Sequence, residues 1–103
     1  MISAQSAVDQ EKERQMNDIL EEASSIINGA RQEEYGKPEI SFEKIADYWS
    51  TYLKHPISAQ DVSLMMILLK VARVPEGKKA SHDTMVDIAG YSAIGSTLSA
   101  LRY

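Results

Sequence analysis

Apolar residues recur at three- and four-residue intervals along most of this chain, the spacing that places them on one face of an α-helix. Four stretches show it, over about residues 9–28, 41–53, 58–74 and 83–101, and the segments between them are polar or contain glycine and proline. Strand signals are weak throughout. The pattern predicts an all-α fold, a compact bundle of about four helices in which short connections make neighbouring helices antiparallel.

Local signals mark where several of these helices begin and how they pack. Ser41 can cap the second helix, and Ser58 with Asp61 has the form of a capping box at the start of the most apolar stretch, DVSLMMILLKVARV. The last helix contains Gly90 and Gly95, each of which costs about 1 kcal/mol relative to alanine. They indicate a thin surface pressed against another helix, either of this chain or of a second copy, and we expect a homo-oligomer.

Length and composition limit the class of protein. A chain of 103 residues is long enough for one domain, and we expect a flexible tail over residues 1–8 and a single helical domain over residues 9–103. The chain has no cysteine, no secretion signal at its start and no apolar run long enough to span a membrane, so we expect a cytoplasmic protein without membrane contact. A formal charge of -4 argues against general nucleic-acid binding.

A candidate site lies where the third and fourth helices are expected to meet. The third helix carries Lys70 and Arg73 near its end, and the fourth begins with Asp83, Asp87 and Tyr91 at four-residue steps on one face. If these helices are antiparallel, two cations face two carboxylates. The cluster is either a structural ion-pair network or a polar pocket in which the cations receive a phosphate and the carboxylates hold a metal or a base.

The polar connector over residues 30–40 offers further binding groups. We expect a loop there, since Gly36 and Pro38 interrupt a helix, and its Arg31 and Tyr35 suit a phosphate and the plane of a base. Trp49 is either a core residue or a stacking surface. Neither histidine has a partner at metal-ligand spacing, and no phosphate loop, nucleophile elbow or cysteine nucleophile is present.

Two blocks of the sequence are distinctive: ILEEASSIINGARQEEYGKPEISFEKIADYW, and DVSLMMILLKVAR followed by DTMVDIAGY. They resemble a family of small, uncharacterised phage and prophage proteins. The resemblance covers about residues 19–95, through a G-x-R-x-x-x-Y-G segment and a closing D-I-A-G-Y. It implies the cytoplasm of an infected host as the location.

The layout is also distantly similar to MazG-type all-α nucleotide pyrophosphatases and to phage nucleotide-modification-associated domains. That similarity implies Mg²⁺ held by helix-borne carboxylates, and oligomeric assembly. Glu21 and Glu22 match the first two acids of the E-E-x-x-E pattern, Ser25 stands at the third, and Asp83 and Asp87 are the later acids.

Three functions follow as alternatives. The first is a phage protein that captures a nucleotide or cyclic nucleotide, such as a host immune signal. Its phosphates would contact Arg31, Lys70 and Arg73, and its base would stack on Tyr35, Trp49 or Tyr91. The second is a Mg²⁺-dependent pyrophosphohydrolase with Glu21, Glu22, Asp83 and Asp87 as metal ligands. The third is an inhibitor that binds a host protein through an acidic helical surface.

Overall fold

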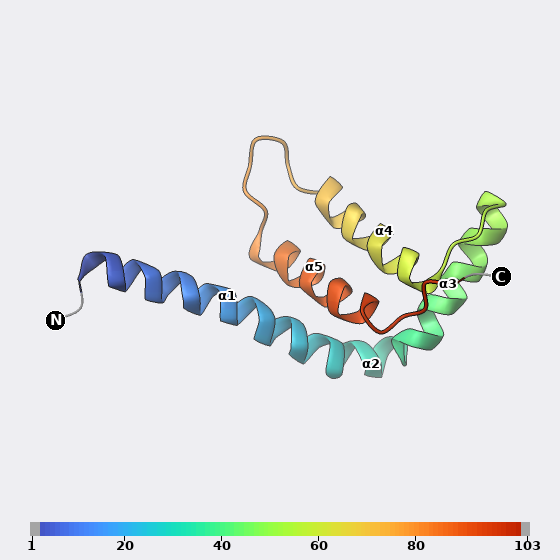
Figure 1. The fold of residues 1–103 in the computed structure, drawn as a ribbon, viewed down its shortest axis with the longest axis horizontal. Helices are drawn as coiled ribbons and strands as arrows, with labels where there is room; N and C mark the ends of the chain where they lie inside the picture. Colours follow the sequence, from blue (N-terminus) through green and yellow to red (C-terminus); the bar gives the residue numbers. More distant parts are fainter. Residues whose placement is uncertain (1–2, 102–103) are drawn as a thin grey trace.

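The computed structural model describes residues 3–101, apart from the side chains of Ala30 and Arg31, and the described part is helical without strands (Figure 1). The all-α prediction is confirmed. The helices are α1 (Ala4–Asn28), α2 (Ala30–Tyr35), α3 (Pro38–Leu53), α4 (Ala59–Ala72) and α5 (His82–Gly95).

Helix α5 lies between α1 and α4, and α3 crosses the end of this layer where α4 begins (Figure 1). Helices α4 and α5 are antiparallel, as their short connection predicts. Helices α1 and α5 instead run parallel: Glu22 contacts His82, and further along both helices Ile27 lies against Gly90. They are not consecutive in the sequence, so no short connection sets their direction.

The hydrophobic core lies where α3, α4 and α5 meet. Phe42 and Ala46 of α3, Val62 of α4 and Ile94 of α5 are almost fully buried there. Trp49 of α3 is half-buried and packs against the same core. Burial of these side chains fixes α5 against α4 and so determines which α5 residues face α1.

The molecule is elongated because α1 extends beyond the bundle. Its principal extents are 61 × 32 × 22 Å, and its radius of gyration is 17.0 Å, against about 13 Å for a compact domain of this size. The side chains of residues 3–18 are all exposed, and this part of α1 projects away from the other helices (Figure 1). Only the second half of α1 packs in the bundle.

The helix starts differ from the sequence expectation at two places. Helix α1 begins at Ala4 rather than near Asp9, because the Ser3 hydroxyl accepts a hydrogen bond from the Ser6 N–H. Residues 4–8, expected as a tail, are therefore helical. Helix α3 begins at Pro38 rather than after Ser41, since a proline at the first helical position has a suitable φ and leaves no N–H unpaired.

The connector and the end of the last helix also differ. Residues 30–35, expected as a loop, form the short helix α2, which ends at Gly36 with a positive φ of 77°. Helix α5 ends at Gly95, not near Leu101. There the hydroxyls of Ser96 and Thr97 donate to backbone carbonyls three residues back, which competes with continued helix formation. The capping box that opens α4 is confirmed.

Candidate functional site

An open pocket of about 210 Å³ lies between the second half of α1, the end of α4 and the face of α5. Most of the residues that line it are apolar, and a lysine, an aspartate and a tyrosine add polar side-chain groups. The lining residues are Ala23, Ile26, Ile27, Lys70, Val86, Asp87, Gly90, Tyr91 and Ile94. An apolar hollow with a few convergent polar groups is the usual form of a small-molecule site.

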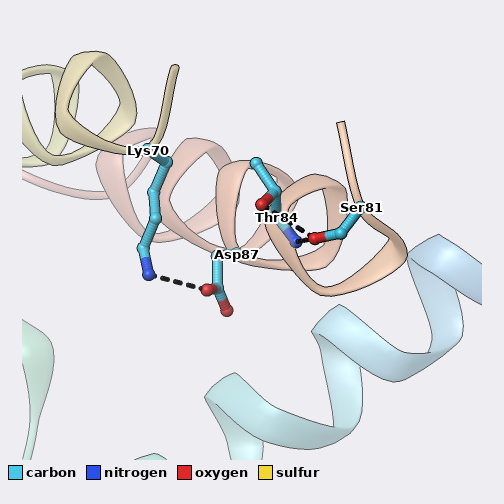
Figure 2. A network of polar contacts seen from close by, with 4 residues as sticks. All are labelled: Lys70, Ser81, Thr84 and Asp87. Carbon is cyan, nitrogen blue, oxygen red and sulfur yellow. Dashed lines mark hydrogen bonds and ion pairs between the residues drawn. The ribbon is translucent and has the colours of Figure 1, made fainter. Parts of the chain in front are cut away.

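Two of the polar lining residues form an ion pair between α4 and α5 (Figure 2). Lys70 Nζ lies 2.8 Å from Asp87 Oδ2, and the two side chains are 22% and 40% exposed. The predicted meeting of cations and carboxylates across these helices is confirmed for this pair. Arg73 and Asp83 are exposed, and neither takes part in an ion pair within the described residues.

Capping at the start of α5 sets the position of Asp87. The Ser81 hydroxyl accepts a hydrogen bond of 3.1 Å from the Thr84 N–H, and the two hydroxyls lie 2.9 Å apart (Figure 2). The helix therefore starts at His82, and Asp87 and Tyr91, one turn apart, both line the pocket. This is the shared face that their four-residue spacing predicts.

The close approach of α1 to α5 depends on Gly90. A Cβ atom at this position would lie 3.3 Å from Ile27 Cγ2, which is a tight contact. The glycine thus brings the α1 wall of the pocket within reach of α5. On the other side of α5, the buried Ser63 hydroxyl donates to the carbonyl of Tyr91, and the Tyr91 ring lies 6.3 Å from that of Phe42.

A second polar contact, between Glu22 and His82, joins α1 to the start of α5. No local pattern in the sequence predicts this contact, because the two residues are 60 positions apart. The hydrogen bond to Glu22 raises the pKa of His82, and the nearby charges of Glu22, Asp83 and Asp18 act in the same direction.

This contact predicts a pH dependence of stability. The pKa of His82 in the folded chain is raised above 6.5, its ordinary value. The stabilisation that the protonated imidazole provides is therefore complete below pH 6.5, and it is lost as the pH rises through the pKa of the folded chain. The effect is small, since the pair is exposed. We expect the melting temperature of the wild type relative to His82→Gln to fall as the pH rises from about 6 to 8. A stability difference between wild type and His82→Gln that stays constant over this pH range would contradict the prediction.

The other predicted binding residues are spread over the molecule. Tyr35 is exposed at the end of α2, Trp49 packs on the core, and neither lines the pocket. The side chain of Arg31 lies outside the described part of the structure. The structure therefore groups Lys70 and Tyr91 with Asp87, and adds apolar α1 residues that no sequence motif marks as binding residues.

The acids predicted as Mg²⁺ ligands do not converge on one point. Glu21 is exposed on α1, Asp83 is exposed on α5, and Glu22 and Asp87 are each engaged by a basic side chain. Within the described residues, no group of three or more His, Asp or Glu side chains could hold a metal ion. The present arrangement does not fit the ion, and the metal assignment stays a prediction.

The fold and pocket define a small all-helical domain with an open pocket between three helices. A family model described as a domain of unknown function (DUF6378) matches residues 18–99, and the chain belongs to this family. It is 46% identical over 74 residues to the Gene 55 protein of Mycobacterium phage D29, a match that covers 72% of this chain and 48% of that protein.

A second relative is the Gene 55 protein of Mycobacterium phage L5, which is 44% identical over 77 residues, covering 74% of this chain and 49% of the relative. The chain thus spans about half the length of the curated relatives it matches. The expected resemblance to uncharacterised phage proteins is confirmed, whereas the likeness to MazG-type enzymes stays a prediction. No solved structure matches the chain. No helix in the described range is both long and apolar enough to cross a membrane.

Proposed function

We propose that this chain binds a nucleotide in the pocket between α1, α4 and α5. The observation that carries the proposal is the Lys70–Asp87 pair in the lining of a pocket that also contains Tyr91 and several apolar side chains. An ammonium and a carboxylate supply directional hydrogen bonds, and the apolar wall covers a flat ring. Nucleotides combine a planar ring that carries donors and acceptors with a charged group that stays in water.

Capture without turnover is favoured over hydrolysis. Metal-assisted attack on a phosphate needs several oxygen ligands on one ion, and here Glu22 and Asp87 are directed to His82 and Lys70. A pocket that only holds its ligand has no such requirement. Sequestration of a nucleotide or cyclic nucleotide, such as a host immune signal, is the corresponding biological role.

A thermal-shift screen against nucleoside mono-, di- and triphosphates and cyclic dinucleotides, with and without Mg²⁺, tests the proposal. A ligand that binds only the folded chain raises the melting temperature as its concentration exceeds Kd. We expect a shift that Lys70→Met reduces and that Lys44→Met, at an exposed lysine on α3, does not.

Ligand recovered intact by chromatography supports capture, and Mg²⁺-dependent products support the hydrolase alternative. If no compound shifts the melt, nucleotide binding is wrong and a host-protein partner becomes the leading alternative.

The outer face of α4 supports the expected homo-oligomer. Leu64, Leu68 and Val71 are 52%, 65% and 52% exposed, and their spacing places them on one side of the helix. Both charged residues of α4 are engaged within the chain, Asp61 in the capping box and Lys70 with Asp87. This face is therefore apolar and uncharged, as the centre of a protein interface is.

Substitution of Leu68 by glutamate should disrupt this assembly. A carboxylate at the centre of an apolar interface loses its hydration without gaining a partner, so we expect the variant to become monomeric or to bind its copies at least tenfold more weakly. Light scattering coupled to size-exclusion chromatography measures the mass. Ser92→Glu, at an exposed residue of α5, is the matched control and should leave the mass unchanged. A wild type that is monomeric at all concentrations would contradict the prediction.

A further inference from the structure

We propose that the Lys70–Asp87 pair recognises the Watson–Crick edge of a guanine base, so that the pocket selects guanine nucleotides. The inference rests on the proposed function and specifies its ligand. The base enters the pocket, and the ribose and phosphates remain outside it. Lys70 therefore binds the base, and not a phosphate as the sequence pattern alone indicated.

The hydrogen-bonding capacity of the pair is only partly used within the chain. Lys70 Nζ has three N–H donors and lies on Asp87 Oδ2, and the described residues provide no other hydrogen bond to either side chain. The pair thus presents a donor beside two acceptor oxygens, at the wall of a pocket that opens to solvent.

Guanine is the base whose edge complements this order of groups. Its O6 accepts a hydrogen bond, and the adjacent N1–H and N2–H both donate, so Lys70 can donate to O6 while the carboxylate of Asp87 accepts both N–H groups. Adenine would direct its N1 lone pair at the carboxylate. Cytosine and uracil each have one nitrogen that can donate on this edge: the exocyclic amine in cytosine and the ring N–H in uracil. A two-oxygen acceptor therefore distinguishes guanine from the other bases.

The size and walls of the pocket agree with one ring system. Its volume of about 210 Å³ is below the range of about 300–1,000 Å³ of sites that enclose drug-sized ligands, so a whole nucleotide does not fit inside. Ile27 from α1 and Val86 from α5 supply apolar contacts for the ring, beside Tyr91. The Lys70 side chain is 22% exposed, and partial burial strengthens the hydrogen bonds that such a side chain makes.

Isothermal titration of the full chain with four monophosphates tests the inference. GMP carries O6, N1–H and the N2 amine, and IMP lacks only the N2 amine. XMP has an O2 carbonyl in place of that amine. AMP has a donor where guanine has O6 and an acceptor where guanine has N1–H. We expect GMP to bind about tenfold or more tightly than IMP, and AMP and XMP to bind more weakly still. If GMP and AMP bind equally, the base-reading role is wrong although nucleotide binding stands. If none of the four binds, the inference is overturned; the wider screen described above then decides the proposed function.

A change of selectivity provides the second test. The amide of Asp87→Asn has one oxygen and one NH₂ group, so it can accept from N1–H and donate to the O2 of xanthine. We expect this variant to bind XMP more tightly than GMP, which loss of folding cannot produce. Asp9→Asn, at an exposed residue of the projecting part of α1, should keep the wild-type order. A variant that still prefers GMP over XMP would overturn the role of Asp87. If the variant does not fold, the comparison of GMP with IMP in the wild type tests whether the pair reads the N2 amine.

Discussion

Replacement of Phe42 by alanine is expected to lower the free energy of unfolding by about 3–5 kcal/mol. Phe42 is 1% exposed, lies at the junction of α3, α4 and α5, and contacts the ring of Tyr91. Its removal leaves a cavity that this small core cannot fill. Because a domain of this size is stable by only about 5–15 kcal/mol, the change removes a large share of the total.

Urea denaturation measures this effect, and the same helix supplies the control. Tyr52 is 86% exposed, so Tyr52→Ala should change the free energy of unfolding by no more than about 0.5 kcal/mol. The slope of the unfolding free energy against urea should be the same in wild type and both variants. A loss below about 1 kcal/mol for Phe42→Ala would mean that α3 does not pack on α4 and α5 as described.

Substitution of Gly95 by alanine should destabilise the chain although alanine is the better helix former. An added Cβ would lie 2.5 Å from Ser63 Oγ and 3.1 Å from Ser63 Cβ, and both residues are buried. The hydroxyl cannot turn away freely, because it donates to the Tyr91 carbonyl. We expect a loss of about 1–3 kcal/mol from overpacking, larger than the helix-propensity gain of about 1 kcal/mol.

A double-mutant cycle with Ser63→Ala isolates this contact. Removal of the hydroxyl takes away the nearer of the two clashing atoms, so the double variant should be more stable than the sum of the single changes indicates. Gly90→Ala is a useful comparison, since its Cβ would meet only the Ile27 Cγ2 methyl, at 3.3 Å. We expect it to be milder than Gly95→Ala. If the Gly95→Ala chain is as stable as the wild type, α4 and α5 lie further apart at Ser63 and Gly95 than described.

The local signals of the sequence predicted the helices and one half of the pocket. The capping box at Ser58 and Asp61 and the short connection between α4 and α5 determine how these two helices meet, and Lys70 and Asp87 follow from that geometry. The two glycines of α5 indicated close packing before any neighbour was known. These features depend on residues within about 40 positions of one another, where pattern and chain reversal are informative.

The α1 half of the pocket could not be predicted in the same way. Ile27 and Glu22 meet α5 residues about 60 positions away, and nothing in the amphipathic pattern of α1 selects α5 over α4 as its neighbour. Helix α2 differs from the loop that the sequence predicts, because Gly36 and Pro38 rule out only a helix that runs through the whole connector. They permit a short helix that ends before them, with Pro38 opening the next one.

An NMR titration of the ¹⁵N-labelled chain with GMP shows whether a nucleotide binds in the pocket between α1, α4 and α5. We expect concentration-dependent shifts at the amides of Lys70, Asp87, Tyr91 and Ile27, which come from three helices but line one pocket. Amides around Tyr35 and on the projecting part of α1 should not move. Shifts confined to those outer regions would contradict a nucleotide site in this pocket, and no shifts at millimolar GMP would exclude guanine recognition by it.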